Sequence, residues 1–140
     1  MKTKEVTLLL VEDDDVDAMT IERSFKKLKI ANTLIRAYDG LEALEILDND
    51  SIPSPFIILL DLQMPRMNGL EFLEAIRNNP KHASSTVFVL TSSATDEDMV
   101  ASYNYNVAGY FLKNSAGDGF LDIVNLLQGY WKIVHFPESQ

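Results

Sequence analysis

The sequence contains no cysteine, so it offers neither a disulfide framework nor a thiolate metal site. It also lacks any apolar run approaching the roughly 18 residues that span a membrane as a helix. Basic residues are few, because 12 lysines and arginines stand against 21 aspartates and glutamates, for a net charge of -9. Binding to phosphate backbones requires a surplus of positive charge, so neither nucleic acid nor a membrane surface is an expected partner. Together these absences favour a cytoplasmic protein.

The length of 140 residues fits one domain that can bury a core of its own, and we expect a single domain over residues 1–140. Its tail, residues 133–140, is expected to fray. Near the N-terminus two lysines precede a short apolar run, but that run ends in acids and not in a small-residue cleavage site. We therefore interpret this run as a first strand and not as a signal peptide.

Five apolar runs of strand length recur along the chain. They are Val6–Val11, Thr33–Tyr38, Phe56–Leu60, Thr86–Thr91 and Ala108–Lys113. Three of them are almost continuously apolar, which is typical of strands that are covered on both faces of a parallel sheet.

The segments between these runs carry apolar residues at helical spacing. The spaced positions are Ala18, Ile21, Phe25 and Leu28, then Leu41, Leu44 and Leu47, then Leu70, Leu73 and Ile76. Thr95 is the expected N-cap of a fourth helix, and a fifth is expected from about Gly119 to Trp131. Strand followed by helix, five times over, predicts an α/β doubly wound, five-stranded parallel sheet with helices on both faces.

Polar residues gather where the expected strands end. Glu12 and Asp13 follow the first strand, Asp61 follows the third, Thr91 ends the fourth and Lys113 ends the fifth. Because ligands of open α/β sheets bind in the crevice beyond the carboxyl ends of the strands, all five side chains are expected at one site.

The chemistry of this group favours a metal and a phosphoryl group. Glu12, Asp13 and Asp61 would repel one another in one crevice unless a cation joined them, and oxygen ligands of this kind favour Mg²⁺, or Mn²⁺ in its place. Thr91 and Lys113 offer a donor and a positive charge to phosphoryl oxygens. Asp61 is then the expected nucleophile, because carboxylates form aspartyl-phosphate intermediates.

Each feature also has an ordinary explanation. Acids are favoured in the first turn of any helix, Asp61 could simply enter a loop, and the hydroxyls near Thr91 could be cap residues. Lys113 alone would be a surface lysine. These explanations do not account for all four features ending strands at one crevice.

Four segments resemble the receiver domain of bacterial two-component response regulators, the CheY-like family. They are "LLLVEDDDVDA", "LLDLQMPRMNGLEFL", "VLTSSA" and "AGYFLKN", and the resemblance extends from Val6 to Trp131. It implies a flavodoxin-like sheet of strand order 2-1-3-4-5.

The resemblance assigns roles residue by residue. It makes Asp61 the phosphorylated residue, with Mg²⁺ held by Glu12, Asp13, Asp61 itself and the backbone carbonyl of Gln63. Asp14, one place past the acidic pair, receives no such role.

The remaining roles concern the response to phosphorylation. Thr91 matches the switch hydroxyl, Tyr110 the switch aromatic and Lys113 the lysine that contacts the phosphoryl group. Gln63 and Ser93, which flank the site, are expected from the family to tune hydrolysis of the acyl phosphate.

One position departs from the family pattern. Receivers usually have proline after the lysine, often following a cis peptide bond, whereas this sequence has Asn114. A cis bond before a residue other than proline costs about 3 kcal/mol, so the geometry after Lys113 is open. This departure, the longer loop before the third strand and the aromatic segment "LLQGYW" are similar to the stand-alone regulators of bacterial phytochrome-type kinases.

We therefore expect a single-domain response regulator that is a signalling phosphoacceptor and not a conventional enzyme. A histidine kinase or phosphotransfer protein would donate the phosphoryl group, and the output would be a contact with a protein target. A homodimer through the fourth helix, fifth strand and fifth helix, or through the C-terminal aromatic region, is an open alternative.

Three other functions compete with this one. A receiver that no longer takes phosphate would act only as an adaptor. An aspartate-nucleophile phosphatase of the haloacid-dehalogenase type would need an acid at Gln63, and a flavodoxin-like flavin protein would need a phosphate loop where "EDDDVD" stands.

Overall fold

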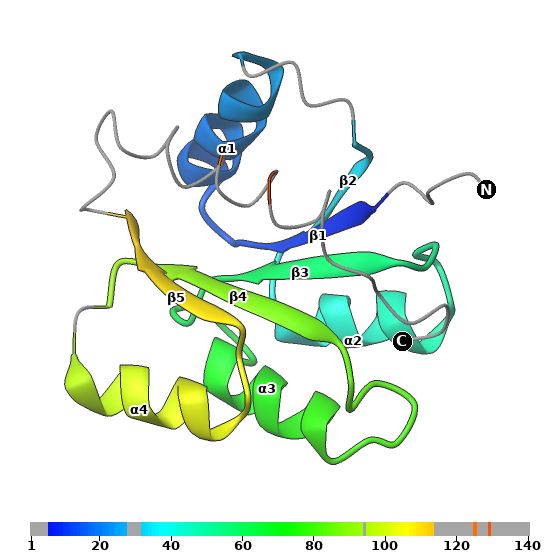
Figure 1. Cartoon of the computed structure of the whole chain (residues 1–140), viewed down its shortest axis with the longest axis vertical. Helices are drawn as coiled ribbons and strands as arrows, with labels where there is room; N and C mark the ends of the chain where they lie inside the picture. Colours follow the sequence, from blue (N-terminus) through cyan, green and yellow to red (C-terminus); the bar gives the residue numbers. More distant parts are fainter. Residues whose placement is uncertain (1–5, 28–31, 94, 114–124, 126–128, 130–140) are drawn as a thin grey trace.

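The computed structural model describes residues 6–27, 32–93, 95–113, 125 and 129. In this part of the chain strands and helices alternate strictly (Figure 1). The elements are β1 (Thr7–Val11), α1 (Asp15–Lys27), β2 (Leu34–Ala37), α2 (Gly40–Asp48), β3 (Phe56–Leu60), α3 (Gly69–Arg77), β4 (Thr86–Thr91), α4 (Asp96–Asn104) and β5 (Gly109–Leu112).

All neighbouring strands pair in parallel, in the order β2-β1-β3-β4-β5. The predicted doubly wound sheet and its strand order are thereby confirmed. The fifth helix expected over Gly119–Trp131, the peptide at Asn114 and the tail 133–140 lie outside the described residues, apart from Asn125 and Gly129.

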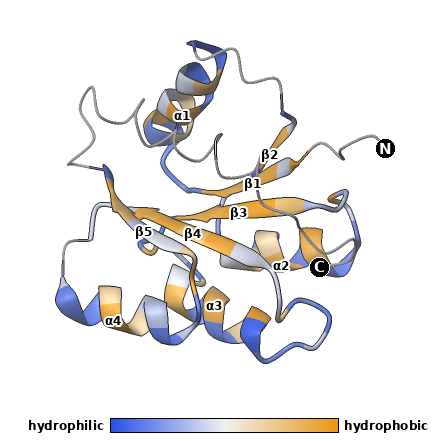
Figure 2. Cartoon of the chain, viewed as in Figure 1, coloured by the Kyte–Doolittle hydropathy of each residue, from blue (hydrophilic) through white to orange (hydrophobic). Residues whose placement is uncertain are grey.

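The sheet is covered on both faces, as Figure 1 shows for α1 on one side and for α2, α3 and α4 on the other. Alternate residues of β1 point to opposite layers: Leu8 and Leu10 pack in the same core cluster as Ile21 of α1, whereas Leu9 packs in the cluster that contains Phe72 of α3. Every residue of β1 and β3 is buried, and Figure 2 shows the apolar centre of the sheet. The near-continuous apolar runs reflect this double coverage.

The helices begin at side chains that cap them. Asp39 accepts a hydrogen bond from the backbone N–H of Glu42, Asn68 forms a capping box with Glu71, and Thr95 caps α4 as predicted. These caps fix where each helix starts beyond the strand edge.

The apolar spacing of α2 predicts its buried face only in part. Leu47 is buried and Leu44 is half-buried, but Leu41 is 38% exposed. The buried face is formed instead by Gly40, Ala43 and Leu47, because the start of α2 lies against Met67 of the β3–α3 loop.

Helix α4 packs least tightly. Ser102 is its one buried residue, while Val100 and Tyr103 are exposed. Tyr103 therefore adds aromatic area to the exposed surface of α4. Within the described residues, no helix is long and apolar enough to cross a membrane.

Candidate functional site

The site lies where β1, β3, β4 and β5 end. The register pairs Val11 with Leu60, and hydrogen bonding continues one residue further, because the backbone N–H of Asp61 donates to the carbonyl of Val11 at 3.0 Å. The N–H of Glu12 donates in the same way to Ala37 at 3.0 Å. The backbones of both acids are therefore held by the sheet.

Asp61 lies at the centre of this edge and is 5% exposed. Its Oδ1 accepts hydrogen bonds from the hydroxyl of Thr91 at 2.8 Å and from the backbone N–H of Gln63 at 3.3 Å. Its Oδ2 lies 3.4 Å from Nζ of Lys113. The structure thus brings together the predicted nucleophile, hydroxyl and lysine.

Three carboxylates meet here as well. Single oxygens of Glu12, Asp13 and Asp61 all lie within 4.8 Å of one another, with Glu12 and Asp61 buried and Asp13 exposed. Burial raises the pKa of Glu12 to about 8, and Lys113 opposes this rise while the charge of Asp61 adds to it. Carboxylate oxygens crowded in this way fit Mg²⁺ or Mn²⁺, which would relieve their repulsion. The ligand role of the Gln63 carbonyl stays a prediction.

Lys113 is shared among three carboxylates. Its Nζ donates to Glu12, to Asp17 at 2.7 Å and to Asp61 at 3.4 Å. Burial favours the neutral amine, but the hydrogen bonds to Asp17 and Glu12 and the charge of Asp61 together raise the pKa of Lys113 above its ordinary value. The side chain is therefore an ammonium ion.

Asp17 is the contact that sequence reasoning missed. It lies in the first turn of α1, four residues after Asp13. Asp13 precedes the helix, so helical spacing gives no signal that would have placed Asp17 beside the acids.

A second missed group supports the β1–α1 loop. The Nε of Arg36 donates to the backbone carbonyl of Glu12 at 3.0 Å, and its guanidinium pairs with Asp15 at 2.8 Å. The ring of Tyr38 stacks on this guanidinium at 4.1 Å. Arg36 thereby joins β2 to the loop that carries the acidic pair.

The predicted switch residues are connected through Ser93. The hydroxyl of Tyr110 donates to the carbonyl of Ser93 at 2.9 Å, and the N–H of Ser93 donates to Oγ1 of Thr91 at 3.3 Å. The hydroxyl of Ser93 donates in turn to Asp98 of α4. A displacement of Thr91 would therefore affect both Tyr110 and the start of α4.

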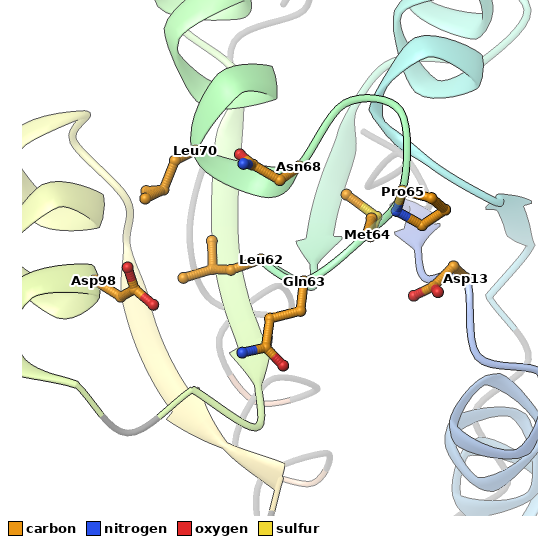
Figure 3. Close-up of a pocket in the computed structure, with 8 residues that line it drawn as sticks. All are labelled: Asp13, Leu62, Gln63, Met64, Pro65, Asn68, Leu70 and Asp98. Carbon is orange, nitrogen blue, oxygen red and sulfur yellow. The ribbon is translucent and has the colours of Figure 1, made fainter.

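A cavity of about 380 Å³ opens beside the acids. Figure 3 shows Asp13 on one side of it and Asp98 on the other, with the β3–α3 loop between them. The other lining residues are Leu62, Gln63, Met64, Pro65, Asn68 and Leu70. The side-chain oxygen of Gln63 accepts from the hydroxyl of Ser92 at 3.1 Å. Of the clustered acids, Asp13 lines this cavity, which is open to solvent beside the buried Asp61.

The β3–α3 loop is fixed at both ends. The N–H of Gly69 donates to the carbonyl of Leu62 at 2.9 Å, and Nε of Arg66 pairs with Asp39 at 2.6 Å. Arg66 has a φ of 62°, in the left-handed region. The hydrogen bond from Arg66 holds the pKa of Asp39 below its usual range. Asp39 thus caps α2 and anchors the loop that follows Asp61.

Comparison with known proteins gives a match over most of the chain. A family model described as the response regulator receiver domain matches residues 8–125. The response regulator Rcp1 of Synechocystis sp. is 34% identical over 128 residues, which cover 89% of this chain and 87% of that protein.

Solved structures agree with this match. The Mn²⁺-bound form of response regulator Rcp1 superposes with a TM-score of 0.83 at 33% identity and covers 96% of this chain and 99% of its own. The phosphorylated cyanobacterial phytochrome response regulator RcpA gives a TM-score of 0.84 at 26% identity, over 95% of this chain and 98% of its own.

Proposed function

The chain belongs to the response regulator receiver family, and on this premise we propose that Asp61 is the residue that accepts the phosphoryl group. Receivers of this family act in two-component signalling as phosphoacceptors and are generally not conventional enzymes. The observation that supports Asp61 is its position: a buried carboxylate that contacts both Thr91 and Lys113 beside an open cavity.

The reaction is a transfer of phosphoryl between two nucleophiles. An oxygen of Asp61 attacks phosphorus, the bond from phosphorus to the donor breaks, and the donor's imidazole nitrogen keeps the electron pair. A carboxylate oxygen carries no proton that must be removed as it attacks. The hydroxyl of Thr91 and the ammonium of Lys113 lie on the two oxygens of this carboxylate and are positioned to stabilise the added charge.

The metal ligands are assigned to the clustered acids. Glu12, Asp13 and Asp61 would hold Mg²⁺ or Mn²⁺ together with the carbonyl of Gln63. The ion supplies positive charge that neutralises the phosphoryl oxygens. The Mn²⁺-bound state of the related Rcp1 supports this assignment.

The phosphoryl donor is a histidine kinase or a histidine phosphotransfer protein. The likeness to a phytochrome response regulator supports a donor of the phytochrome type. The acceptor of the signal is a protein target or a second copy of the chain. Hydrogen bonds link Thr91 through Ser93 to Tyr110 and to α4. Through them the conformational change at the phosphorylated site reaches the surface of α4, which includes Val100 and Tyr103.

Intact-mass spectrometry after incubation with acetyl phosphate tests this function. We expect one phosphoryl adduct in the presence of Mg²⁺, none with EDTA, and none for Asp61→Asn. Asp13→Asn should need far more Mg²⁺, whereas the neighbouring Asp14→Asn serves as the control and should need no more Mg²⁺ than the wild type.

The opposite result is equally informative. A folded protein that binds Mg²⁺ but forms no adduct with acetyl phosphate or with a histidine-phosphorylated donor is an adaptor that does not take phosphate. An adduct that persists in Asp61→Asn would place the phosphoryl group elsewhere.

A further inference from the structure

The ammonium of Lys113 lies closer to Asp17 than to Asp61, whose phosphoryl group it is expected to contact. Its Nζ is 2.7 Å from Oδ2 of Asp17 and 3.4 Å from Oδ2 of Asp61. In the proposed function the same ammonium must contact a phosphoryl group on Asp61. The structure therefore places the ammonium of Lys113 against Glu12 and Asp17, and farther from Asp61.

We propose that Asp17 is a positioning residue that restrains Lys113 and thereby slows phosphorylation of Asp61. The inference rests on the proposed function. It assigns to this chain a fourth carboxylate that contacts neither the phosphoryl group nor the metal but competes for the lysine.

The placement of Asp17 is built into the start of α1. Its backbone N–H donates to Oδ1 of Asp14 at 3.0 Å, so the first turn that carries the Asp17 side chain is fixed. The side chain of Asp17 is 42% exposed, whereas that of Lys113 is only 12% exposed. The ion pair therefore lies at the rim of the site, where its carboxylate is accessible and its ammonium is not.

Asp17 differs from the other two partners of Lys113. Glu12 and Asp61 belong to the group of carboxylates that fits a metal, and Asp17 does not. The charge of Glu12 and Asp61 is shared with the cation in the proposed function. The charge of Asp17 is then available to Lys113 alone. Its attraction for the ammonium therefore becomes stronger than the attraction of Glu12 and Asp61.

The effect on the equilibrium follows from differential contact. The ion pair of Lys113 with Asp17 stabilises the unphosphorylated arrangement and is lost or weakened when Lys113 moves to the phosphoryl oxygens. A contact made in only one of two states shifts the equilibrium toward that state. Removal of the charge at position 17 should therefore free Lys113 and favour phosphorylation.

A second explanation must be separated from this one. Removal of any negative charge near Asp61 favours an incoming anion through Coulomb's law, whether or not Lys113 is involved. The two explanations differ when Lys113 is absent, because restraint requires the lysine and general repulsion does not. A double-mutant cycle distinguishes them.

The experiment measures the rate constant of phosphorylation by acetyl phosphate at saturating Mg²⁺, in the wild type and in Asp17→Asn. Asp17→Glu keeps the charge, and Glu22→Gln removes one exposed charge further along α1. Each is compared with the same variant in a Lys113→Ala background. With Lys113 present, we expect Asp17→Asn to be phosphorylated roughly three- to tenfold faster than the wild type. In the Lys113→Ala background, Asp17→Asn should be phosphorylated no faster than Glu22→Gln. Asp17→Glu should stay within about twofold of the wild type.

A spectroscopic measurement is independent of the phosphorylation rate. Hydrogen exchange of the Lys113 ammonium, followed by ¹⁵N NMR of its side chain, should be faster in Asp17→Asn than in the wild type or Glu22→Gln. This decides the question if the Lys113→Ala variants react too slowly to measure.

Three outcomes overturn the inference: an Asp17→Asn rate equal to or below that of the wild type, an acceleration that persists without Lys113, or ammonium exchange that does not change. A folded wild type that forms no adduct would instead overturn the proposed function. In that event the exchange measurement still tests the restraint on Lys113.

Discussion

The hydroxyl of Thr91 donates a 2.8 Å hydrogen bond to Oδ1 of Asp61, and both side chains are buried. Thr91→Val keeps the shape of the side chain but removes this donor. We expect a loss of about 1–3 kcal/mol in the free energy of unfolding at neutral pH, because a buried carboxylate is left with fewer donors. Urea denaturation measures it, and Thr91→Ser should retain most of the stability. Equal stability of the valine variant would show that the bond contributes nothing to folding.

Gly69 begins α3 directly against the backbone that carries Asp61. A Cβ at position 69 would lie 2.6 Å from the carbonyl oxygen of Asp61 and 2.7 Å from Cα of Leu62. Gly69→Ala should therefore cost about 1–3 kcal/mol of stability and slow phosphorylation, since relief of the clash displaces the strand end.

Gly40 provides the comparison for this substitution. Its nearest neighbours are Cγ of Met67 at 2.7 Å and Sδ at 3.0 Å, which belong to a flexible side chain, with the Met67 carbonyl oxygen also at 3.0 Å. Thermal unfolding should rank Gly40→Ala as the milder substitution. The reverse order would mean that the β3–α3 loop is easier to displace than the side chain of Met67.

The central part of the site was predictable because strand ends coincide. Apolar runs mark the strands, and parallel strands end at one edge, so Asp61, Thr91 and Lys113 could be placed together without knowledge of any loop. The contacts of Asp17 and Asp39 were not predictable on the same grounds. They depend on the rotation of α1 and on the conformation of the β3–α3 loop, which strand and helix periodicity do not specify.

The exposure of Leu41 has the same origin. Its i, i+3 spacing from Leu44 is compatible with a buried position, but the close contact of Gly40 with Met67 rotates the buried face of α2 toward Ala43. Tertiary contact at one end of the helix thus overrides the pattern of side chains along it.

Arg77, the last residue of α3, contacts the segments that precede β4 and β5, at the edge of the sheet opposite the site. Its guanidinium donates to the backbone carbonyls of Tyr105 at 2.6 Å, Ser85 at 2.7 Å, Ala83 at 3.0 Å and Asn106 at 3.2 Å. Lysine cannot reach these acceptors with one ammonium group. Arg77→Lys should therefore lower the free energy of unfolding by about 2–3 kcal/mol, as charged hydrogen bonds are lost.

The control for Arg77 is the exposed arginine of α1. Arg23→Lys should change stability by less than about 0.5 kcal/mol, and both variants should form the phosphoryl adduct once folded. Loss of the adduct in Arg77→Lys at temperatures where it remains folded would reveal a coupling to the site that the contacts do not predict.

The pair formed by Asp39 and Arg66 should make stability depend on pH. Asp39→Asn keeps an oxygen that caps Glu42, at 2.9 Å in the wild type, but removes the charge that faces Arg66. Because Arg66 holds the pKa of Asp39 below its usual range, ionised Asp39 stabilises the folded state. This contribution is complete above the pKa of an aspartate in the unfolded chain and is lost as the pH falls through the lower folded value.

Urea denaturation at several pH values therefore has a definite expected form. The wild type should exceed Asp39→Asn in stability by a constant amount from pH 7 to about 5, and the difference should shrink below about pH 4. Arg66→Ala should lose the pair but keep the left-handed backbone, whereas Arg66→Gly loses the pair and relieves the strain at φ 62°. Arg66→Gly should thus be the more stable of the two, and in both the pKa of Asp39 should rise toward its ordinary value. A difference between wild type and Asp39→Asn that stays constant down to pH 3 would show that the lost charge is not what destabilises the variant.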